Sequence, residues 1–248
     1  MQRVKLLIEY LGTDYVGWQS QNNGKSIQEE IEQALFEIFK KKIKIFVAGR
    51  TDAGVHAFGQ VAHFDLESDK LEEKKIYYAI NFFLKKNNNK ITIIDSEFVG
   101  NTFHSRFSVK QKVYLYKILN RKTPSYIFED RAWFVPGRVD IFKMKKASKY
   151  LIGRHDFNAF RSVDCQAKSS VKTIDDITFT ENSDFIEIRI FGKSFMHNQV
   201  RIIVGTLLNV GRELIDESSI RGILNSKERK NAGPTAPAIG LYLEKIKY

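Results

Sequence analysis

An arginine and an aspartate, Arg50 and Asp52, lie two residues apart in a short segment framed by Gly49 and Gly54. Apolar runs precede and follow this segment, which is typical of a loop between two strands. Glycines let the backbone of such a loop approach a ligand closely, while the strands hold its side chains. A carboxylate held in this way can act as a nucleophile or as a base. Asp52 is therefore the first candidate for chemistry, with Arg50 projecting to the same side; the alternative is a hairpin loop with a surface ion pair.

Other common reactive constellations do not occur in the sequence. The five histidines and the single cysteine, Cys165, show no spacing typical of a zinc site. The sequence has no Gly-x-x-x-x-Gly-Lys-Ser/Thr phosphate loop, no Gly-x-Gly-x-x-Gly turn and no Gly-x-Ser-x-Gly elbow. We therefore expect neither a metal nor a small-molecule cofactor.

The composition indicates a globular protein with an excess of basic residues. The 248 residues include 40 Lys+Arg against 29 Asp+Glu, which gives a formal net charge of +11. This excess favours polyanionic partners, nucleic acid before an anionic membrane surface, although a lysine-rich composition encoded by an AT-rich genome is the alternative. One cysteine excludes an internal disulfide, and no apolar run approaches the roughly 20 residues that span a bilayer. We expect a cytoplasmic protein without a leader and without membrane association.

The loop around Asp52 needs rigid neighbours, and periodic patterns predict them in the first 105 residues. Alternating apolar residues indicate strands, and a capping box at Ser26 and Glu29 indicates a helix start. The expected elements are a strand over residues 1–10, a helix from Ser26, strands on both sides of Asp52, a helix through residues 76–83 and a strand over residues 91–94. This order is that of a ferredoxin-like half.

The pattern starts again in residues 106–248, which we interpret as a second half. The expected elements are strands over residues 109–119, 185–191 and 240–248, and helices through residues 141–151, 198–211 and 220–226. Residues 155–172 are polar and irregular, and we interpret them as a candidate binding loop. No linker separates residues 1–105 from residues 106–248, so we expect the halves to share one sheet. The predicted fold class is α/β of the α+β type, with a mixed, largely antiparallel central sheet from two ferredoxin-like halves flanked by helices.

Short blocks along nearly the whole chain resemble the tRNA pseudouridine synthase A family. The segment Gly-Arg-Thr-Asp-Ala-Gly-Val-His-Ala over residues 49–57 resembles the nucleophile loop of that family. The other similar blocks lie over residues 9–19, 26–29, 103–107, 114–116, 155–166, 195–205, 232–237 and 240–243. Two departures occur in one block: Asn198 stands where the family often has a second histidine, and Ile202 where it often has an asparagine. Residues 81–84 also lack a proline that is usual there.

The resemblance implies the pseudouridine synthase fold, a cleft between the two halves and a homodimer that binds the anticodon arm of tRNA. The reaction turns uridines at positions 38, 39 and 40 into pseudouridine: the C1′–N1 bond breaks, the base rotates, and C5 joins C1′. No atoms are gained or lost, so the reaction requires neither a redox cofactor nor a metal. Asp52 would be the nucleophile, attacking either C1′ of the ribose or C6 of the base; the residues leave both open.

The resemblance also gives roles to three other residues. Arg201 matches the arginine that pairs with the aspartate, and Arg50 the arginine that displaces and holds the flipped nucleotide. Tyr114 matches an aromatic residue that stacks on the uracil and assists proton removal from C5. From the residues alone, Tyr114 would be a packing residue of a strand and Arg201 a solvated helix residue. We expect packing or supporting roles for Trp18, His56, Phe195 and His197.

Two other classes of function compete with this interpretation. A non-catalytic RNA-binding protein would have no use for Asp52, because a carboxylate near phosphates is repulsive. A metal-dependent nuclease ordinarily gathers several carboxylates around its ions, and the sequence shows no such cluster. The presence of Asp52 beside Arg50 therefore favours an enzyme.

Overall fold

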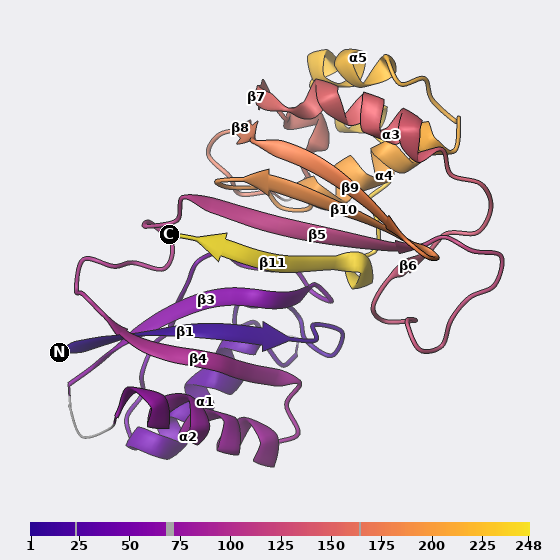
Figure 1. Cartoon of the computed structure of the whole chain (residues 1–248). Coiled ribbons are helices and arrows are strands. Elements are labelled where there is room, and N and C mark those ends of the chain that lie inside the picture. Colours follow the sequence, from indigo (N-terminus) through magenta and orange to yellow (C-terminus); the bar gives the residue numbers. More distant parts are fainter. Residues whose placement is uncertain (23, 68–71, 164) are drawn as a thin grey trace. The chain divides into compact units, whose positions relative to one another are not determined.

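The computed structural model describes residues 1–22, 24–67, 72–163 and 165–248. The chain forms two compact units, of which unit 1 contains Met1–Lys110 and Tyr242–Tyr248, and unit 2 contains Gln111–Leu241. The chain therefore leaves unit 1 after Lys110 and returns to it for its last strand. Strands and helices occur in both units, as Figure 1 shows, so the predicted mixed α/β class is confirmed.

Unit 1 has the strand order of a ferredoxin-like half. Its elements are β1 (Gln2–Tyr10), α1 (Ile27–Phe39), β2 (Phe46–Val47), β3 (His56–Leu66), α2 (Glu73–Lys86), β4 (Ile91–Val99) and β11 (Leu241–Lys247). The sheet runs β4-β1-β3, with antiparallel pairing at each step, and β2 pairs antiparallel with β3. This is the arrangement that the order of predicted elements implies.

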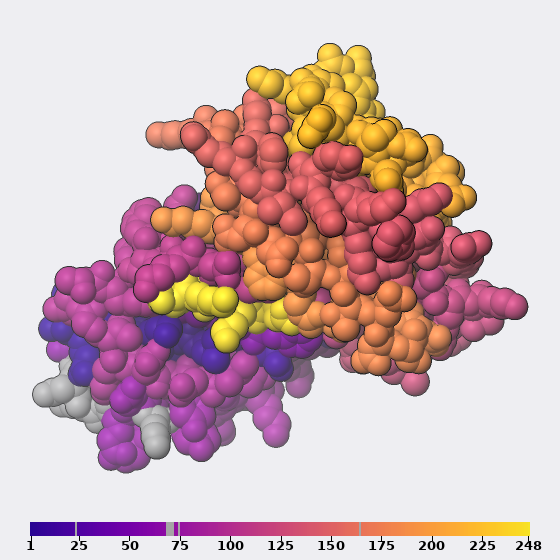
Figure 2. All heavy atoms as spheres, turned by 45° about the horizontal axis from the view of Figure 1, so that its top comes forward, coloured from indigo at the N-terminus to yellow at the C-terminus, as the bar shows by residue number. Residues whose placement is uncertain are grey.

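The last strand, β11, also lies against β3, in parallel orientation, where Tyr242 pairs with His56. The ring centroids of Tyr242 and Phe58 lie 4.8 Å apart in a stacked arrangement. In Figure 2 the yellow atoms of this C-terminal segment lie among indigo and purple atoms of unit 1. Unit 1 is therefore built from both ends of the sequence.

Buried and partly exposed residues alternate along β1, and this alternation shows which face of the unit 1 sheet packs in the hydrophobic core. Val4, Leu6 and Ile8 are fully buried, and Figure 1 shows α1 and α2 together on one face of this sheet. The intervening residues lie on the other face, where Arg3 is opposite Asp65 and Lys5 is opposite His63 on β3. Period-two alternation of this kind requires one buried and one polar face.

The predicted capping box is confirmed at the start of α1. The Ser26 side chain accepts a hydrogen bond from the Glu29 backbone N–H at 3.2 Å. The Glu29 carboxylate in turn accepts from the Ser26 hydroxyl at 3.0 Å. The helix ends at Phe39, and Lys40 follows in the left-handed conformation with φ 52°.

Unit 2 repeats much of this order along the chain. Its elements are β5 (Gln111–Leu119), β6 (Trp133–Phe134), α3 (Ile141–Ser148), β7 (Gly153–Asp156), β8 (Val171–Ile174), β9 (Asp176–Asn182), β10 (Phe185–Gly192), α4 (Gln199–Gly211) and α5 (Ser219–Ser226). The strands β5, β10 and β9 pair antiparallel in that order, β6 pairs parallel with β5, and β7 pairs with β8. In chain order, β5, α3, β9, β10 and α4 repeat the order of the first five main elements of unit 1, and the strand that follows them, β11, belongs to unit 1.

Two features of unit 2 differ from the sequence-based expectation. Residues 155–172 are not irregular throughout, because the ends of this segment pair as β7 and β8, with His155 opposite Lys172. The strand β9 was also not expected. Polar strands at a sheet edge are held by backbone hydrogen bonds and carry little apolar alternation, which explains both differences.

Candidate active site

Asp52 lies in a loop of residues 48–55 that joins β2 to β3, which we call the Asp52 loop. The loop begins where the Ala48 N–H donates to the Val61 carbonyl at 2.8 Å. In its middle the Thr51 carbonyl accepts from the Trp18 N–H at 3.0 Å. The Val55 N–H donates to the Asp52 carbonyl at 3.2 Å, so backbone hydrogen bonds hold the loop before and after the Asp52 side chain.

The segment that follows β1 packs closely against the Asp52 loop, and two of its glycines allow this close approach. A Cβ on Gly12 would lie 2.1 Å from the Val55 carbonyl oxygen. Gly17 has φ +107°, and a Cβ there would lie 2.7 Å from the Thr51 carbonyl oxygen. Any other residue at either position would push the segment away from the Asp52 loop.

A buried hydrogen-bond cluster supports the loop from β1 and β3. The hydroxyls of Tyr10 and Thr51 lie 2.8 Å apart. The Gln60 side-chain amide donates to the Gly49 carbonyl at 2.8 Å and to the Tyr10 hydroxyl at 3.3 Å. Burial raises the pKa of Tyr10 to about 12, and the nearby charge of Asp52 adds to this effect. The Tyr10 hydroxyl therefore keeps its proton at neutral pH and remains able to donate to Thr51.

The two charged side chains of the loop differ in exposure. Asp52 is half-buried, whereas Arg50 is exposed. A half-buried carboxylate on a fixed backbone can meet a ligand with little loss of conformational freedom. The exposed guanidinium has the freedom to reach a nucleic acid beside it.

Tyr114 lies in unit 2, on β5, opposite Ile190 of β10. Its side chain is 8% exposed, and the Phe195 ring meets the Tyr114 ring edge-on, with centroids 5.2 Å apart. Phe195 thus fixes the orientation of the Tyr114 ring, which agrees with the supporting role expected for it. The small exposure means that little of the tyrosine reaches solvent.

Arg201 lies in the first turn of α4, where two hydrogen bonds orient its guanidinium. Its Nε donates to the Ala236 carbonyl at 2.6 Å, and its Nη1 donates to the Asn198 side-chain oxygen at 2.7 Å. Asn198 is the residue before α4 and has φ 60°. Asparagine adopts this left-handed conformation more readily than most residues, so it can both start the helix and hold the arginine.

The segment of residues 232–237 is positioned on α4 by close backbone contact. A Cβ on Gly205 would lie 1.9 Å from the Pro234 carbonyl oxygen. The Gly233 N–H donates to the Thr206 hydroxyl at 2.9 Å. These contacts place the Ala236 carbonyl beside Arg201, which the sequence block of residues 232–237 alone does not indicate.

The structure thus groups the predicted site residues by unit. Arg50 and Asp52 share one loop of unit 1, and Tyr114 and Arg201 belong to unit 2. Sequence reasoning assigned no role to Gln60 or Tyr10, because only the register of β1 on β3 brings them together. It identified Asn198 as a departure from the family pattern but not as the acceptor for Arg201.

We expect packing or supporting roles for Trp18 and His56, and both side chains are buried. Trp18 is 1% exposed and its ring centroid lies 6.1 Å from that of Tyr10. The His56 Nδ1 accepts from the Gly12 N–H at 2.9 Å, so it is engaged in holding the backbone.

The described part of the chain contains neither a metal-ligand cluster nor a membrane-spanning helix. No three His, Cys, Asp or Glu side chains among the residues with described positions gather where they could hold a metal ion. Within the same residues, every helix is too short or too polar to cross a membrane.

Comparison with known proteins gives a consistent result over the whole chain. A sequence profile described as "tRNA pseudouridine synthase" matches residues 6–108 and 147–248. A protein named "tRNA pseudouridine synthase A" from Anaplasma phagocytophilum (strain HZ) is 46% identical over 248 residues, covering 99% of this chain and 100% of that protein. Proteins of the same name from Wolbachia pipientis wMel and Ehrlichia ruminantium (strain Welgevonden) are also 46% identical, each over 247 residues, 99% of this chain and 100% and 99% of their own lengths.

Proposed function

Because the chain belongs to the tRNA pseudouridine synthase family, a family of isomerases, we propose that it converts uridine to pseudouridine in the anticodon stem-loop of tRNA. The proposed targets are positions 38, 39 and 40. The observation that carries the proposal is the Asp52 loop, since a half-buried carboxylate on a fixed backbone lies within a chain 46% identical to named synthases along its whole length.

Asp52 is the proposed nucleophile. Its carboxylate forms a bond to C1′ of the ribose or to C6 of the uracil, the C1′–N1 bond breaks, and the base rotates. C5 then joins C1′, and the bond between Asp52 and the substrate breaks, which restores the free carboxylate. The proton that leaves C5 is balanced by the one that N1 gains, so the product is an isomer of the substrate. The buried cluster of Tyr10, Thr51 and Gln60 supports this role, because attack requires the carboxylate to be held within about 1 Å of its reactive position.

The other predicted residues have proposed roles in the same reaction. Arg50 displaces and holds the flipped nucleotide, and its exposure supports this role. Tyr114 stacks on the uracil and assists proton removal from C5, and Arg201 pairs with the Asp52 carboxylate. The hydrogen bonds to Ala236 and Asn198 hold the Arg201 guanidinium in one orientation, which supports a fixed pairing of this kind.

We also propose that the protein acts as a homodimer in the cytoplasm, as the family resemblance implies. The net charge of +11 supports binding that is dominated by contacts to the phosphates of tRNA. Sedimentation of the purified protein tests the dimer directly, because a monomer at micromolar concentration would contradict it.

The decisive experiment is to map pseudouridine in tRNA before and after incubation with the purified protein. New pseudouridine at positions 38, 39 or 40 is the expected result, and its absence from every tRNA of a total pool would contradict the proposal. The same assay in EDTA, with monovalent salt to keep the tRNA folded, should give equal product because isomerisation needs no metal. A loss of product that one particular divalent ion restores, with tRNA folding verified, would contradict the metal-free reaction.

A further inference from the structure

Unit 1 presents two exposed aromatic rings on the segment that follows β4 and on the strand β2. Phe107 is 73% exposed and Phe46 is 41% exposed. Single exposed apolar residues are common on protein surfaces and require no explanation by themselves. The surroundings of these two rings are unusual, because each lies in an ordered stack with a cation above it.

Imidazole rings connect the two phenylalanines to the sheet. The His104 ring centroid lies 4.4 Å from that of Phe107 and 5.9 Å from that of Phe46. His63 of β3 stacks on Phe46 at 5.2 Å and meets His104 at 4.7 Å. Burial holds the pKa of His63 at about 4 and lowers the pKa of His104 as well, so both rings are neutral at physiological pH. The stack therefore consists of uncharged rings that extend from the sheet to the surface.

Two exposed cations lie over the two phenylalanine rings. The Lys44 Nζ lies 5.9 Å from the centroid of Phe46, and the Arg106 guanidinium carbon lies 5.7 Å from that of Phe107. Both cations belong to exposed residues. We call these residues, Lys44, Phe46, His104, Arg106 and Phe107, the aromatic–cation patch.

The segment that carries Phe107 is held rigidly at Ser105. This serine is fully buried, and its hydroxyl donates to the Phe46 carbonyl at 2.6 Å. Its N–H donates to His63 Nδ1 at 3.2 Å, and its carbonyl accepts from the Tyr248 hydroxyl at 2.7 Å. Every polar group of Ser105 is thus used to fix the backbone directly before Arg106 and Phe107.

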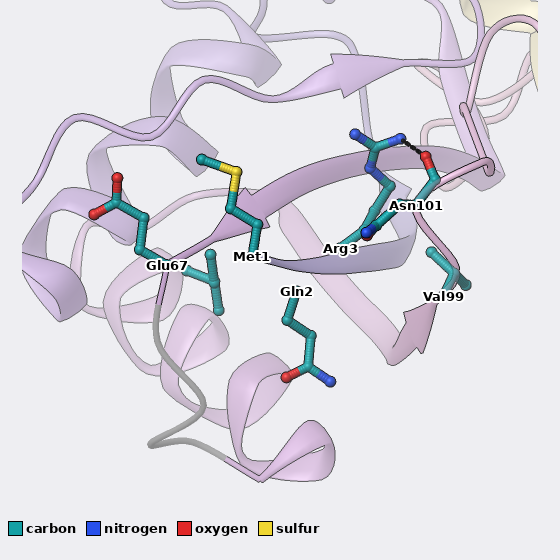
Figure 3. A pocket seen from close by; sticks show the side chains of 7 residues that line it. Met1, Gln2, Arg3, Glu67, Val99 and Asn101 are labelled. Atoms are coloured by element: carbon teal, nitrogen blue, oxygen red, sulfur yellow. Dashed lines mark hydrogen bonds between the residues drawn. The ribbon is translucent and has the colours of Figure 1, made fainter.

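A second anchor lies a few residues earlier. Arg3 donates to the carbonyls of Asn101 and Phe103 at 2.8 and 2.6 Å, and it pairs with Asp65 through two hydrogen bonds. Figure 3 shows Arg3 and Asn101 joined in this way beside a shallow hollow at the start of β1. Together the anchors make the exposure of Phe107 a fixed property of the fold.

We propose that the aromatic–cation patch is a docking surface for an unpaired stretch of the substrate RNA, with a base stacked on Phe107 and flanking phosphates at Arg106 and Lys44. Base stacking on an aromatic ring combined with cation contacts to phosphates is the usual way in which proteins bind single-stranded nucleic acid. A patch for a second copy of the chain would instead be expected to expose a contiguous apolar area with few charges. This inference rests on tRNA being the substrate and adds a contact outside the Asp52 loop.

Substitutions at Phe107 test the stacking contact by equilibrium binding of tRNA. Phe107→Leu keeps the residue apolar but removes the ring, and it should raise the tRNA Kd by about 5-fold or more. Phe107→Tyr keeps the ring and should bind within about 2-fold of the wild type. The matched control is Phe142→Leu in unit 2, because Phe142 is 66% exposed with Lys146 Nζ 4.9 Å from its ring, yet Lys146 is paired with Glu217. This control should leave the Kd unchanged.

A second measurement tests the phosphate contact. The slope of log Kd against log salt concentration reports the number of phosphates that the protein neutralises. Arg106→Gln should lower this slope by about 1, the change expected for the loss of one phosphate contact, whereas Arg106→Lys should retain the wild-type slope.

Three results would overturn the inference. The first is an unchanged Kd and salt slope for Phe107→Leu and Arg106→Gln. The second is equal weakening by Phe107→Leu and Phe107→Tyr, and the third is dissociation of an oligomer by Phe107→Leu, which would assign the patch to a second copy. Failure of the proposed function is a separate outcome, because pseudouridine formation tests that function and the Kd values test the patch. If the wild-type protein binds tRNA but forms no pseudouridine, the Kd values of the variants can still be compared with that of the wild type.

Discussion

The hydroxyl oxygens of Tyr10 and Thr51 lie 2.8 Å apart, and Thr51 directly precedes Asp52. Gln60 joins the same cluster and donates to the carbonyl of Gly49, two residues before Thr51. The segment directly before Asp52 is thus held by side chains from two neighbouring strands. These side chains are expected to act through Asp52 without touching the substrate.

Tyr10→Phe tests this positioning role. The variant removes the hydrogen bond to Thr51, so the free energy of unfolding should fall by about 1–2 kcal/mol. The single-turnover rate should fall about tenfold, because a small displacement of Asp52 weakens its attack, while the tRNA Kd stays constant. The control is Ser96→Ala, which removes a buried hydrogen bond to the Glu73 carbonyl in the same unit. An equal loss of rate in this control would show that Tyr10 acts only through stability.

Asp52→Asn should abolish pseudouridine formation, because it removes the nucleophile while preserving the size of the side chain. The tRNA Kd should stay constant or decrease, since a negative charge near phosphates is removed. The free energy of unfolding should be unchanged or slightly higher, as is common when a reactive residue is replaced. Asp52→Glu should also fail, because one added methylene moves the carboxylate by about 1 Å or more. Substantial turnover by Asp52→Asn, with contaminating wild-type enzyme excluded, would contradict the mechanism.

Tyr114 can be tested by separating its hydroxyl from its ring. Tyr114→Phe should retain tRNA binding and slow the reaction if the hydroxyl moves a proton. Tyr114→Leu should also lose stacking on the base, a loss of about 1–3 kcal/mol in binding, and the edge contact with Phe195. Lower melting temperatures with normal specific activity in both variants would instead identify Tyr114 as a core residue.

Asn198 combines a backbone role with a side-chain role, and two substitutions separate them. Asn198→Gly keeps the left-handed conformation and should leave the free energy of unfolding nearly unchanged, whereas Asn198→Ala should lower it by about 1 kcal/mol. Both variants remove the acceptor for Arg201 and should lower the single-turnover rate to the same extent. A normal rate in Asn198→Gly would show that Arg201 does not depend on this hydrogen bond.

His63 should make the stability of unit 1 depend on pH. Its pKa is about 4 in the folded protein, below the ordinary value of 6.5, because the ring is buried and lies near His104 and Arg3. Protonation of His63 therefore favours the unfolded chain. The contribution of neutral His63 to the free energy of unfolding is complete above about pH 6.5 and is lost progressively toward pH 4. The loss should reach about 3 kcal/mol at most.

Denaturant titrations from pH 7 to pH 4 measure this dependence. Replacing His63 with Gln should make the free energy of unfolding depend less steeply on pH over that range than it does in the wild type. Parallel curves for the wild type and His63→Gln would contradict the assignment to His63, since the carboxylates of the protein titrate in both.

Local signals in the sequence predicted most of the elements. The alternation in β1 and the capping box at Ser26 each depend on only a few neighbouring residues, and both predictions are confirmed. The strand β9 and the pairing of β7 with β8 were missed, because edge strands depend on backbone hydrogen bonds that leave little trace in composition. The sequence predicts the candidate site as a set of residues, and it does not predict the contacts that hold them. Gln60 meets Tyr10 across 50 residues through a register that includes a bulge between Ile8 and Tyr10, which no pattern of nearby residues encodes.

The membership of β11 in unit 1 has a consequence for biosynthesis. Residues 242–248 leave the ribosome only after all of unit 2 has been made. At roughly 5–20 residues per second, the edge of β3 that receives β11 stays without this partner for on the order of ten seconds. An unpaired strand edge can pair with other nascent chains. The order of translation therefore exposes unit 1 to misassembly during synthesis, because its fold can be completed only after the residues of unit 2 have been made.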